Sequence, residues 1–174
     1  WWGLVFYKPS SMISKVKKDI EIYLKSKNIN SIILSMSGGV DSIVLLDILL
    51  EIKNIYKQKL NVSIYHINYN MHTNSYKSYK LCRSISKKHN LIFYSDNMKL
   101  SNTNFESTAR KIRYENINNI SNENKIDLIL TAHHFDDQLE TLIMKHEDKA
   151  DWVSFLGIRK YYNKLYRPLL NVNK

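Results

Sequence analysis

The feature that most constrains the fold of this chain is a regular alternation of short apolar runs with longer stretches of helical spacing. Four runs are nearly continuous in apolarity and rich in β-branched or aromatic residues: SIILSM (31–36), NVSIYHI (61–67), LIFYS (91–95) and IDLILTA (126–132). Such runs are typical of strands that are covered on both faces. We therefore interpret them as the strands of a parallel sheet.

The stretches between these runs carry apolar residues at helical spacing. One predicted helix precedes the first strand, near Ile13 to Leu24, and three others are marked by Ile43, Leu46, Leu49 and Leu50, by Tyr79, Cys82 and Ile85, and by Ala109, Ile112 and Ile117. Strand and helix alternate roughly every 30 residues, which indicates an α/β fold, a doubly wound parallel sheet with helices on both faces. We expect residues 1–30 to form an N-terminal segment and helix, and residues 31–174 to form one catalytic domain.

Composition excludes several classes of protein. A chain of 174 residues with 44% hydrophobic residues can bury one substantial core. Its one cysteine, Cys82, excludes an internal disulfide and any CxxC pair, and it suits a reducing compartment. The apolar opening WWGLVFY is too short to span a bilayer and lacks the features of a secretory signal. We expect no membrane association and a cytoplasmic location, with an organelle as the alternative.

The charge of the chain indicates an anionic partner. The 26 Lys and Arg residues against 16 Asp and Glu residues give a net charge of +10. A nucleic acid is a natural partner for such a chain, because phosphate contacts release counterions. The chain is also crowded with Lys, Asn, Ile and Tyr, a bias expected from an AT-rich genome. Composition alone leaves both explanations open.

A pair of glycines follows the first predicted strand, in the stretch SMSGGVDS. In parallel α/β sheets, ligands bind at the carboxyl ends of the strands. Ser37, Gly38 and Gly39 precede a helix expected to begin near Asp41 or Ser42, so backbone N–H groups and the helix N-terminus could together hold an anion. The loop is shorter than GxxxxGK[ST] and has no lysine. A tight turn without a ligand is the alternative for SGG alone, but its position favours the anion site.

The complete motif SGGVDS resembles the pyrophosphate-binding loop of the ATP pyrophosphatases, the PP-loop enzymes, which use ATP to adenylate a substrate oxygen. Later stretches narrow the resemblance to the tRNA(Ile)-lysidine synthetase family, in which they occur in the same order: HINYNMH (66–72), NFESTARKIRY (104–114), TAHHFDDQLET (131–141) and RPLL (167–170). The resemblance extends from about Ile32 to Leu170. It implies an adenine nucleotide alpha hydrolase-like fold and ATP as cofactor. The implied reaction adenylates the wobble cytidine of an isoleucine tRNA at its C2 oxygen and then ligates free L-lysine to C2, forming lysidine.

The resemblance also implies roles for the residues of the loop. The expected ATP-binding residues are Ser37, Gly38, Gly39, Val40, Asp41 and Ser42. Asp41 is placed to hold Mg²⁺, the expected metal, on the leaving pyrophosphate, and Ser42 to donate to a phosphate. Without the resemblance, Asp41 could serve only as a cap of the helix.

Two arginines in the stretch ARKIRY are expected to act in catalysis. Arg110 and Arg113 lie three residues apart, on one face of a predicted helix. Their guanidinium groups could hold phosphates or neutralise the charge that develops as pyrophosphate leaves. Solvated surface positions are the alternative for helical arginines, and the resemblance favours catalysis.

An acidic cluster follows the fourth predicted strand. Asp136, Asp137 and Glu140 fall in the helix expected after TAHH, and their spacing puts Glu140 on a face shared with both aspartates. These acids could complement the helix dipole, or they could receive Mg²⁺ or a cationic substrate. The resemblance implies that Asp137 and Glu140 bind lysine. A carboxylate or a histidine could deprotonate the lysine amine, and His133 is the histidine expected to act in catalysis.

The chain departs from the family pattern in several places. Where the family reads close to HVNHGLR, this chain has Tyr69, Asn70 and His72 in place of histidine, glycine and arginine. His72 carries no permanent charge, so a phosphate contact there is expected to be weaker. The stretch MKHEDKADWVSFLG replaces a basic loop that contains glycine, and the sequence stops at Lys174, just beyond RPLL. We therefore expect the catalytic domain to be incomplete at its C-terminal end and much of the RNA specificity to be missing.

Two other functions remain open. A tRNA thiolase of the PP-loop group would use the same adenylation to deliver sulfur, usually through paired cysteines or a cluster, and Cys82 alone disfavours it. A non-catalytic nucleotide- or RNA-binding remnant is the other alternative. The sequence contains no indication of oligomeric state.

Overall fold

The computed structural model describes residues 11–56, 59–69, 73–98, 105–134 and 159–172. Its elements, in chain order, are α1 (Ser11–Ser26), β1 (Ser31–Ser35), α2 (Val40–Ile55), β2 (Asn61–Asn68), α3 (Thr73–Lys88), β3 (Ile92–Asn97), α4 (Phe105–Glu123), β4 (Leu128–Thr131), β5 (Tyr161–Tyr162) and β6 (Leu165–Tyr166). The four strands and four helices predicted from the apolar pattern up to residue 132 are confirmed, with ends that differ by a few residues. The helix predicted after TAHH lies outside the described residues.

The strands form one sheet in the order β3-β2-β1-β4-β6-β5. Strands β1 to β4 and β6 pair in parallel, and β5 pairs with β6 in the antiparallel direction. The α/β class and the parallel sheet are therefore confirmed, and the short β5–β6 hairpin at the edge was not predicted. A hairpin of this size has two residues per strand, so it carries no hydrophobic period in the sequence.

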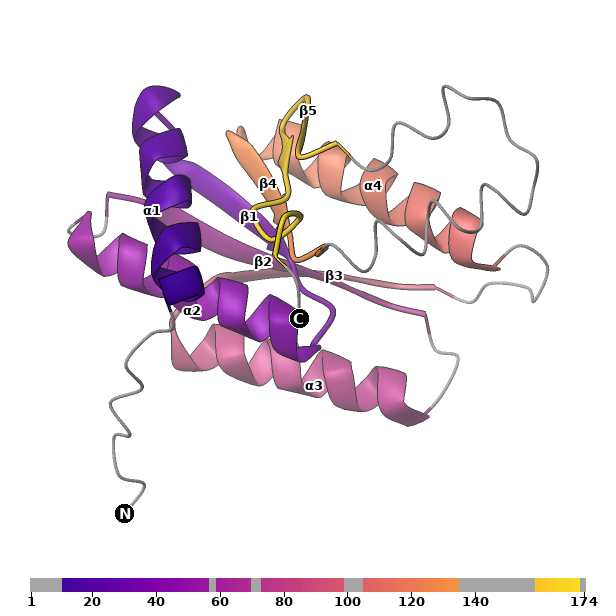
Figure 1. Ribbon diagram of the computed structural model, residues 1–174. Coiled ribbons are helices and arrows are strands. Elements are labelled where there is room, and N and C mark those ends of the chain that lie inside the picture. The colour runs from indigo at the N-terminus through magenta and orange to yellow at the C-terminus, as the bar shows by residue number, and fades with distance from the viewer. Residues whose placement is uncertain (1–10, 57–58, 70–72, 99–104, 135–158, 173–174) are drawn as a thin grey trace, which may run out of the picture.

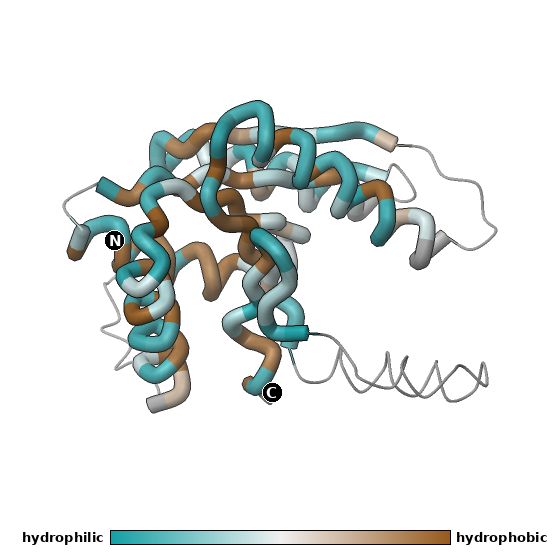
Figure 2. The backbone as a smooth tube through the Cα atoms, turned by 90° about the horizontal axis from the view of Figure 1, so that it is seen from above, coloured by the Kyte–Doolittle hydropathy of each residue, from teal (hydrophilic) through white to brown (hydrophobic). Residues whose placement is uncertain are grey.

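Helices cover both faces of the sheet, and Figure 1 shows α4 on the side away from α2 and α3. Alternate residues of β1 explain why. Ile32 and Leu34 belong to a core cluster with buried residues of α1, α2 and α3, whereas Ile33 belongs to a second cluster with Ile117 of α4. Helix α1, predicted within the N-terminal segment 1–30, contributes Ile20 to the first cluster. Figure 2 shows the hydrophobic residues concentrated along the central strands.

One carboxylate holds together the amino ends of β1 and β4. Asp127 accepts hydrogen bonds from the N–H groups of Asn30 and Ser31 at 3.0 and 2.9 Å, and from the Ser31 hydroxyl at 2.8 Å. At the other end of the strands, Ser35 of β1 is in register with Tyr65 of β2 and with Thr131 of β4. The carboxyl ends of three central strands therefore lie side by side, which is where an α/β sheet binds its ligands. No helix in the described ranges is long and apolar enough to cross a membrane.

Candidate active site

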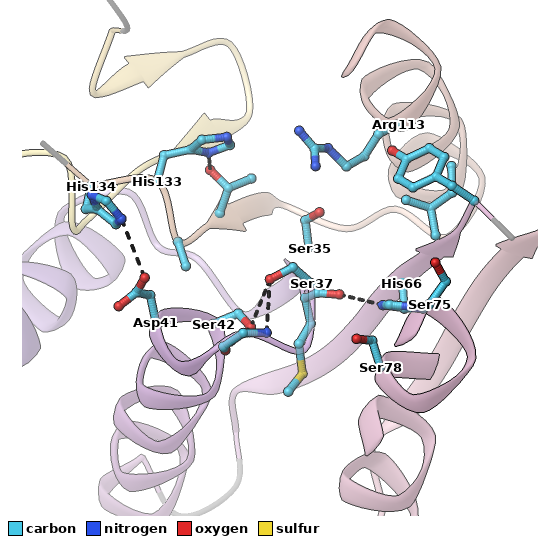
Figure 3. A pocket seen from close by; sticks show the side chains of 16 residues that line it. Ser35, Ser37, Asp41, Ser42, His66, Ser75, Ser78, Arg113, His133 and His134 are labelled. Carbon is cyan, nitrogen blue, oxygen red and sulfur yellow. Dashed lines mark hydrogen bonds and ion pairs between the residues drawn. The ribbon is translucent and has the colours of Figure 1, made fainter. Parts of the chain in front are cut away.

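A cavity of about 400 Å³ opens at the carboxyl ends of β1, β2 and β4 (Figure 3). Its walls come from the loop after β1, the start of α2, the end of β2, one face of α3, α4 and the end of β4. The lining residues are Ser35, Met36, Ser37, Gly39, Asp41, Ser42, His66, Ile67, Tyr69, Ser75, Ser78, Arg113, Thr131, Ala132, His133 and His134. The loop singled out in the sequence therefore shares one cavity with Arg113 and the TAHH histidines.

The two glycines of the loop have different structural roles. Gly38 has a φ of +88°, and a Cβ built on it would lie 3.1 Å from the Cβ of Ser78 in α3. Glycine is therefore required at position 38 by the fold itself. Gly39 is the N-cap of α2, with the ordinary extended values φ −78° and ψ 162°, and its nearest neighbour to a built Cβ is the Ser37 hydroxyl at 3.4 Å. The fold therefore leaves space for a side chain at position 39, which faces the cavity.

Hydrogen bonds hold the loop around the start of α2. The Ser37 hydroxyl accepts a bond from the Gly39 N–H at 3.2 Å, and the buried Ser42 hydroxyl donates to the Gly39 carbonyl at 2.7 Å. The first backbone bond of the helix runs from the Ile43 N–H to that same carbonyl at 3.2 Å. The N–H groups of Val40, Asp41 and Ser42 precede it, so the helix dipole and these donors can act on an anion at the cavity wall. The Val40 side chain is 75% exposed, so its part is limited to its backbone.

Asp41 provides the one carboxylate of the described cavity lining. Its Oδ2 lies 3.5 Å from Nε2 of His134, which follows β4 (Figure 3). The contact joins the start of α2 to the end of β4 across one side of the cavity. His134 had no predicted role, and its contact with Asp41 depends on tertiary packing that the sequence alone does not reveal.

His133 faces the cavity as a neutral imidazole. Its Nδ1 lies 2.8 Å from the Thr131 hydroxyl, which fixes the ring beside the strand end. Burial, followed in decreasing order by the positive charges of Arg113, Arg110 and Arg167, lowers the pKa of His133 to about 3. At neutral pH the ring is therefore a hydrogen-bonding group and a weak base.

Arg113 and Arg110 turn to different places, although both were predicted to hold phosphates. Arg113 reaches from α4 into the cavity toward His133, as Figure 3 shows, and its Nε is buried without a hydrogen-bond partner among the described residues. Arg110 lies one turn earlier and lines a neighbouring cavity with Tyr114. A spacing of three residues leaves two helical side chains about 60° apart around the axis, because each residue turns about 100°. The two arginines were expected to share one phosphate site, but of the two only Arg113 lines this cavity.

His66 is a cavity residue to which the sequence assigned no role of its own. Its Nδ1 lies 2.8 Å from the Met36 carbonyl oxygen, which can only accept, so Nδ1 carries the proton. Burial lowers the pKa of His66, so the ring is neutral and Nε2 is an acceptor. Nε2 is buried without a hydrogen-bond partner in the described part of the chain. A ligand N–H or O–H group is a suitable partner for it after a small local adjustment.

Other predicted residues lie outside the described ranges. They are Asp136, Asp137 and Glu140 of the acidic cluster, with Asn70 and His72 of the altered HINYNMH stretch. Tyr69, the third departure from the family pattern, lines the cavity and donates its hydroxyl to the Ala109 carbonyl at 3.1 Å. It therefore joins the end of β2 to α4 at the back of the site.

Comparison with known proteins gives a family and a fold. Residues 12–174 match the family model described as PP-loop domain. The chain is 35% identical over 153 residues to a tRNA(Ile)-lysidine synthase of Mesoplasma florum, covering 83% of this chain and 37% of the relative. It is 31% identical over 153 residues to the tRNA(Ile)-lysidine synthase of Staphylococcus epidermidis, covering 82% of this chain and 35% of that relative. The chain thus spans little more than a third of these relatives.

A solved structure has the same fold at low sequence identity. It is the U34-tRNA thiolase NcsA of Methanococcus maripaludis with its [4Fe-4S] cluster, which superposes with a TM-score of 0.71 at 20% identity. The match covers 93% of this chain and 60% of the thiolase.

Proposed function

Because this chain belongs to the PP-loop domain family, we propose that the cavity binds ATP and that the chain acts as the ATP-using part of a tRNA(Ile)-lysidine synthase. The observation that carries the proposal is the position of the SGGVDS loop, whose helix N-terminus faces Arg113 across one cavity. This combination of backbone donors and a guanidinium suits a polyphosphate. The two relatives described above carry that synthase name, which supports the choice of substrates.

The first proposed step adenylates the RNA. The C2 oxygen of the wobble cytidine attacks the α-phosphorus of ATP, the bond to the bridging oxygen breaks, and pyrophosphate leaves. The N–H groups at the start of α2 hold the pyrophosphate, and Arg113 neutralises the charge that develops on it. The Ser42 hydroxyl donates its one proton to the Gly39 carbonyl, so it supports the loop and reaches a phosphate only if that bond breaks. His66 Nε2 accepts a hydrogen bond from the nucleotide and helps to orient it.

Mg²⁺ fits the residues of this cavity. The described lining contains one carboxylate, Asp41, at the helix N-terminus, and within the described ranges no group of three or more His, Cys, Asp or Glu side chains surrounds a common point. Mg²⁺ commonly binds through one or two carboxylates together with substrate phosphates and water. We propose that Asp41 holds it, and the ion when bound supplies charge compensation on the pyrophosphate.

The second proposed step transfers lysine. The ε-nitrogen of lysine attacks C2 of the adenylated cytidine, the C2–oxygen bond breaks, AMP leaves with that oxygen, and the nitrogen loses a proton. Asp137 and Glu140 are proposed to bind the lysine cation. His133 orients the reacting groups as a neutral imidazole, and the negative charge of a bound phosphate would raise its pKa toward the range of a useful base.

Transfer of labelled lysine tests the proposal directly. The chain is incubated with ATP, radiolabelled lysine and either isoleucine tRNA or another tRNA, and label on RNA is followed together with pyrophosphate release. We expect label on isoleucine tRNA, and we expect Asp41→Asn to stop pyrophosphate release. Asp47→Asn is the matched control, because it removes the same charge from an exposed position of the same helix.

The same experiment separates the alternative functions. A thiolase would release pyrophosphate without placing lysine on the RNA, and a binding remnant would hold ATP without releasing pyrophosphate. The thiolase is disfavoured by Cys82, the one cysteine of the chain, because it is fully buried and burial raises the pKa of its thiol to about 11.

A further inference from the structure

A second cavity lies beside the first, between α4 and the β5–β6 hairpin. Its volume is about 270 Å³, and its lining includes Arg110, Tyr114, Asn118, Tyr162, Asn163 and Arg167. Helix α4 borders both cavities, since it contributes Arg113 to the first and Arg110 to the second. A ligand in the second cavity would therefore lie next to the proposed ATP site.

Arg167 lines this cavity although the residue is almost completely buried. The residue is 6% exposed, and its Nε has no hydrogen-bond partner among the described residues. The rest of the guanidinium is fixed, with Nη1 donating to the Arg159 carbonyl at 2.6 Å and Nη2 donating to the Tyr114 hydroxyl at 3.2 Å. A buried cation that is held in one orientation and has no carboxylate partner among the described residues suits an anionic ligand.

Two further arginines surround the same ring. The guanidinium carbons of Arg110, Arg113 and Arg167 lie 5.9, 5.7 and 5.9 Å from the centre of Tyr114. Among the described residues, none of the three forms a salt bridge with an Asp or Glu side chain. Cation–π contacts with Tyr114 orient the three groups, and no carboxylate in the described part of the chain compensates their positive charge. The field of all three reaches the neighbouring cavity, where it lowers the pKa of His133.

The rim of the cavity offers an aromatic surface. Tyr162 lines the cavity and is 55% exposed. Its neighbour Tyr161 is 43% exposed but is already stacked against Tyr23 and Tyr166. An exposed ring beside a cationic pocket is the arrangement with which proteins bind single-stranded nucleic acid, by stacking a base and pairing its phosphate. The asparagines Asn118 and Asn163 add neutral hydrogen-bonding groups.

We propose that this cavity holds a nucleotide of single-stranded RNA adjacent to the reacting cytidine, with its phosphate on Arg110 and Arg167 and its base against Tyr162. The inference rests on the proposed function, because it takes the RNA substrate from it. It reassigns Arg110 from the phosphates of ATP to a phosphate of the RNA. The result is a second contact that positions the RNA beside the ATP-binding loop.

The test compares two charge removals on neighbouring residues of α4. Fluorescence anisotropy measures the affinity of the chain for a labelled anticodon stem–loop of isoleucine tRNA at several salt concentrations. We expect Arg110→Met to weaken binding about tenfold and to reduce the salt slope by about one. Lys111→Met is the control, since Lys111 is exposed and pairs only loosely with Glu115 at 3.9 Å, and it should change affinity by less than about twofold.

A second pair of variants tests the base contact independently of the arginines. Tyr162→Leu should weaken RNA binding about tenfold. Tyr76→Leu, at a position of α3 with 54% exposure, should have little effect. Equal losses in the two tyrosine variants would contradict the stacking assignment.

The remaining outcomes are equally decisive. Equal losses in Arg110→Met and Lys111→Met would mean that net charge alone drives binding, and the proposal would be wrong. A loss of ATP affinity in Arg110→Met with unchanged RNA affinity would return Arg110 to the nucleotide. Millimolar inorganic phosphate should displace the RNA from the wild-type chain but not from Arg110→Met. That result would support a phosphate contact at this cavity.

The inference and the proposed function fail separately. RNA binding that depends on Arg110 and Tyr162, without lysine transfer by the wild-type chain, would support the cavity and contradict the synthase. Lysine transfer by Arg110→Met with an unchanged KM for tRNA would support the synthase and contradict the RNA contact at this cavity.

Discussion

Replacement of Gly39 by serine should separate the stability of the fold from the binding of ATP. Position 39 is the N-cap of α2 and has extended backbone angles. A serine there can accept a hydrogen bond from the N–H of Asp41 or Ser42, which is the preferred chemistry of an N-cap. A Cβ at this position meets only the Ser37 hydroxyl, at the ordinary distance of 3.4 Å. We therefore expect the free energy of unfolding to change by less than about 0.5 kcal/mol, because glycine and serine differ by only a few tenths as N-caps.

The same substitution should weaken ATP binding strongly. The serine hydroxyl takes a donor that the phosphate needs, and its Cβ occupies the wall of the cavity. Losing one hydrogen bond to a charged group costs about 1.5–3 kcal/mol, which is about 10- to 100-fold in affinity. Gly38→Ala is the contrasting variant, because its φ of +88° and the 3.1 Å approach to Ser78 make the cost one of folding. That cost is about 2 kcal/mol, and it should lower the Tm by about 4–8 °C.

Calorimetric titration with ATP and urea unfolding followed by circular dichroism measure the two quantities. We expect Gly39→Ser to be as stable as the wild type and to bind ATP weakly. We expect Gly38→Ala to unfold at a lower urea concentration. Wild-type ATP affinity in a stably folded Gly39→Ser variant would show that the phosphates lie elsewhere. An unchanged stability of Gly38→Ala would show that the loop relaxes without cost.

Three further predictions concern single side chains. The pKa of His133 is lowered to about 3 from an ordinary value of 6.5, so the stability that the neutral ring contributes is present above pH 6.5 and is lost as the pH falls toward 3. His133→Gln should therefore reduce the loss of stability between pH 6.5 and pH 3, as measured by urea unfolding. Burial alone would raise the pKa of Asp127, but hydrogen bonds from Asn30 and Ser31 outweigh it and lower the pKa, so Asp127→Asn should destabilise the chain at pH 7 and by less below the carboxyl pKa, as thermal melts at the two pH values will show. Glu140→Gln should keep pyrophosphate release and lose lysine transfer, since it removes the charge but keeps the shape, and a joint loss of both signals with intact ATP binding would move Glu140 to the adenylation step.

The strands and helices could be predicted from the sequence because parallel strands buried on both faces leave long apolar runs. SIILSM and IDLILTA were placed correctly for this reason. The β5–β6 hairpin could not be predicted in this way, because a strand of two residues, such as Tyr161 and Tyr162, is too short to show an alternation of buried and exposed side chains. Its turn contains Asn163 with a φ of +52°, and asparagine in a polar stretch between aromatic residues was the available signal.

The candidate site was predictable where it depends on one contiguous segment. The loop from Ser37 to Ser42 was located from the glycine pair and the helix that follows it. Contacts between distant segments were not predictable, such as His134 with Asp41 or the burial of His66 against the Met36 carbonyl. Helical spacing alone also put Arg110 and Arg113 on one face, whereas in the structure the two side chains line different cavities. The roles assigned to Asp137 and Glu140 remain predictions.

Under the proposed function, the chain cleaves ATP between its α- and β-phosphates to activate RNA. The most direct measurement uses ATP labelled at the α- or the γ-phosphate, with isoleucine tRNA and without lysine. We expect equal amounts of pyrophosphate and of α-label bound to RNA, both dependent on tRNA and both lost in Asp41→Asn. Release of the γ-label as orthophosphate, or release of pyrophosphate without any label on the RNA, would contradict it.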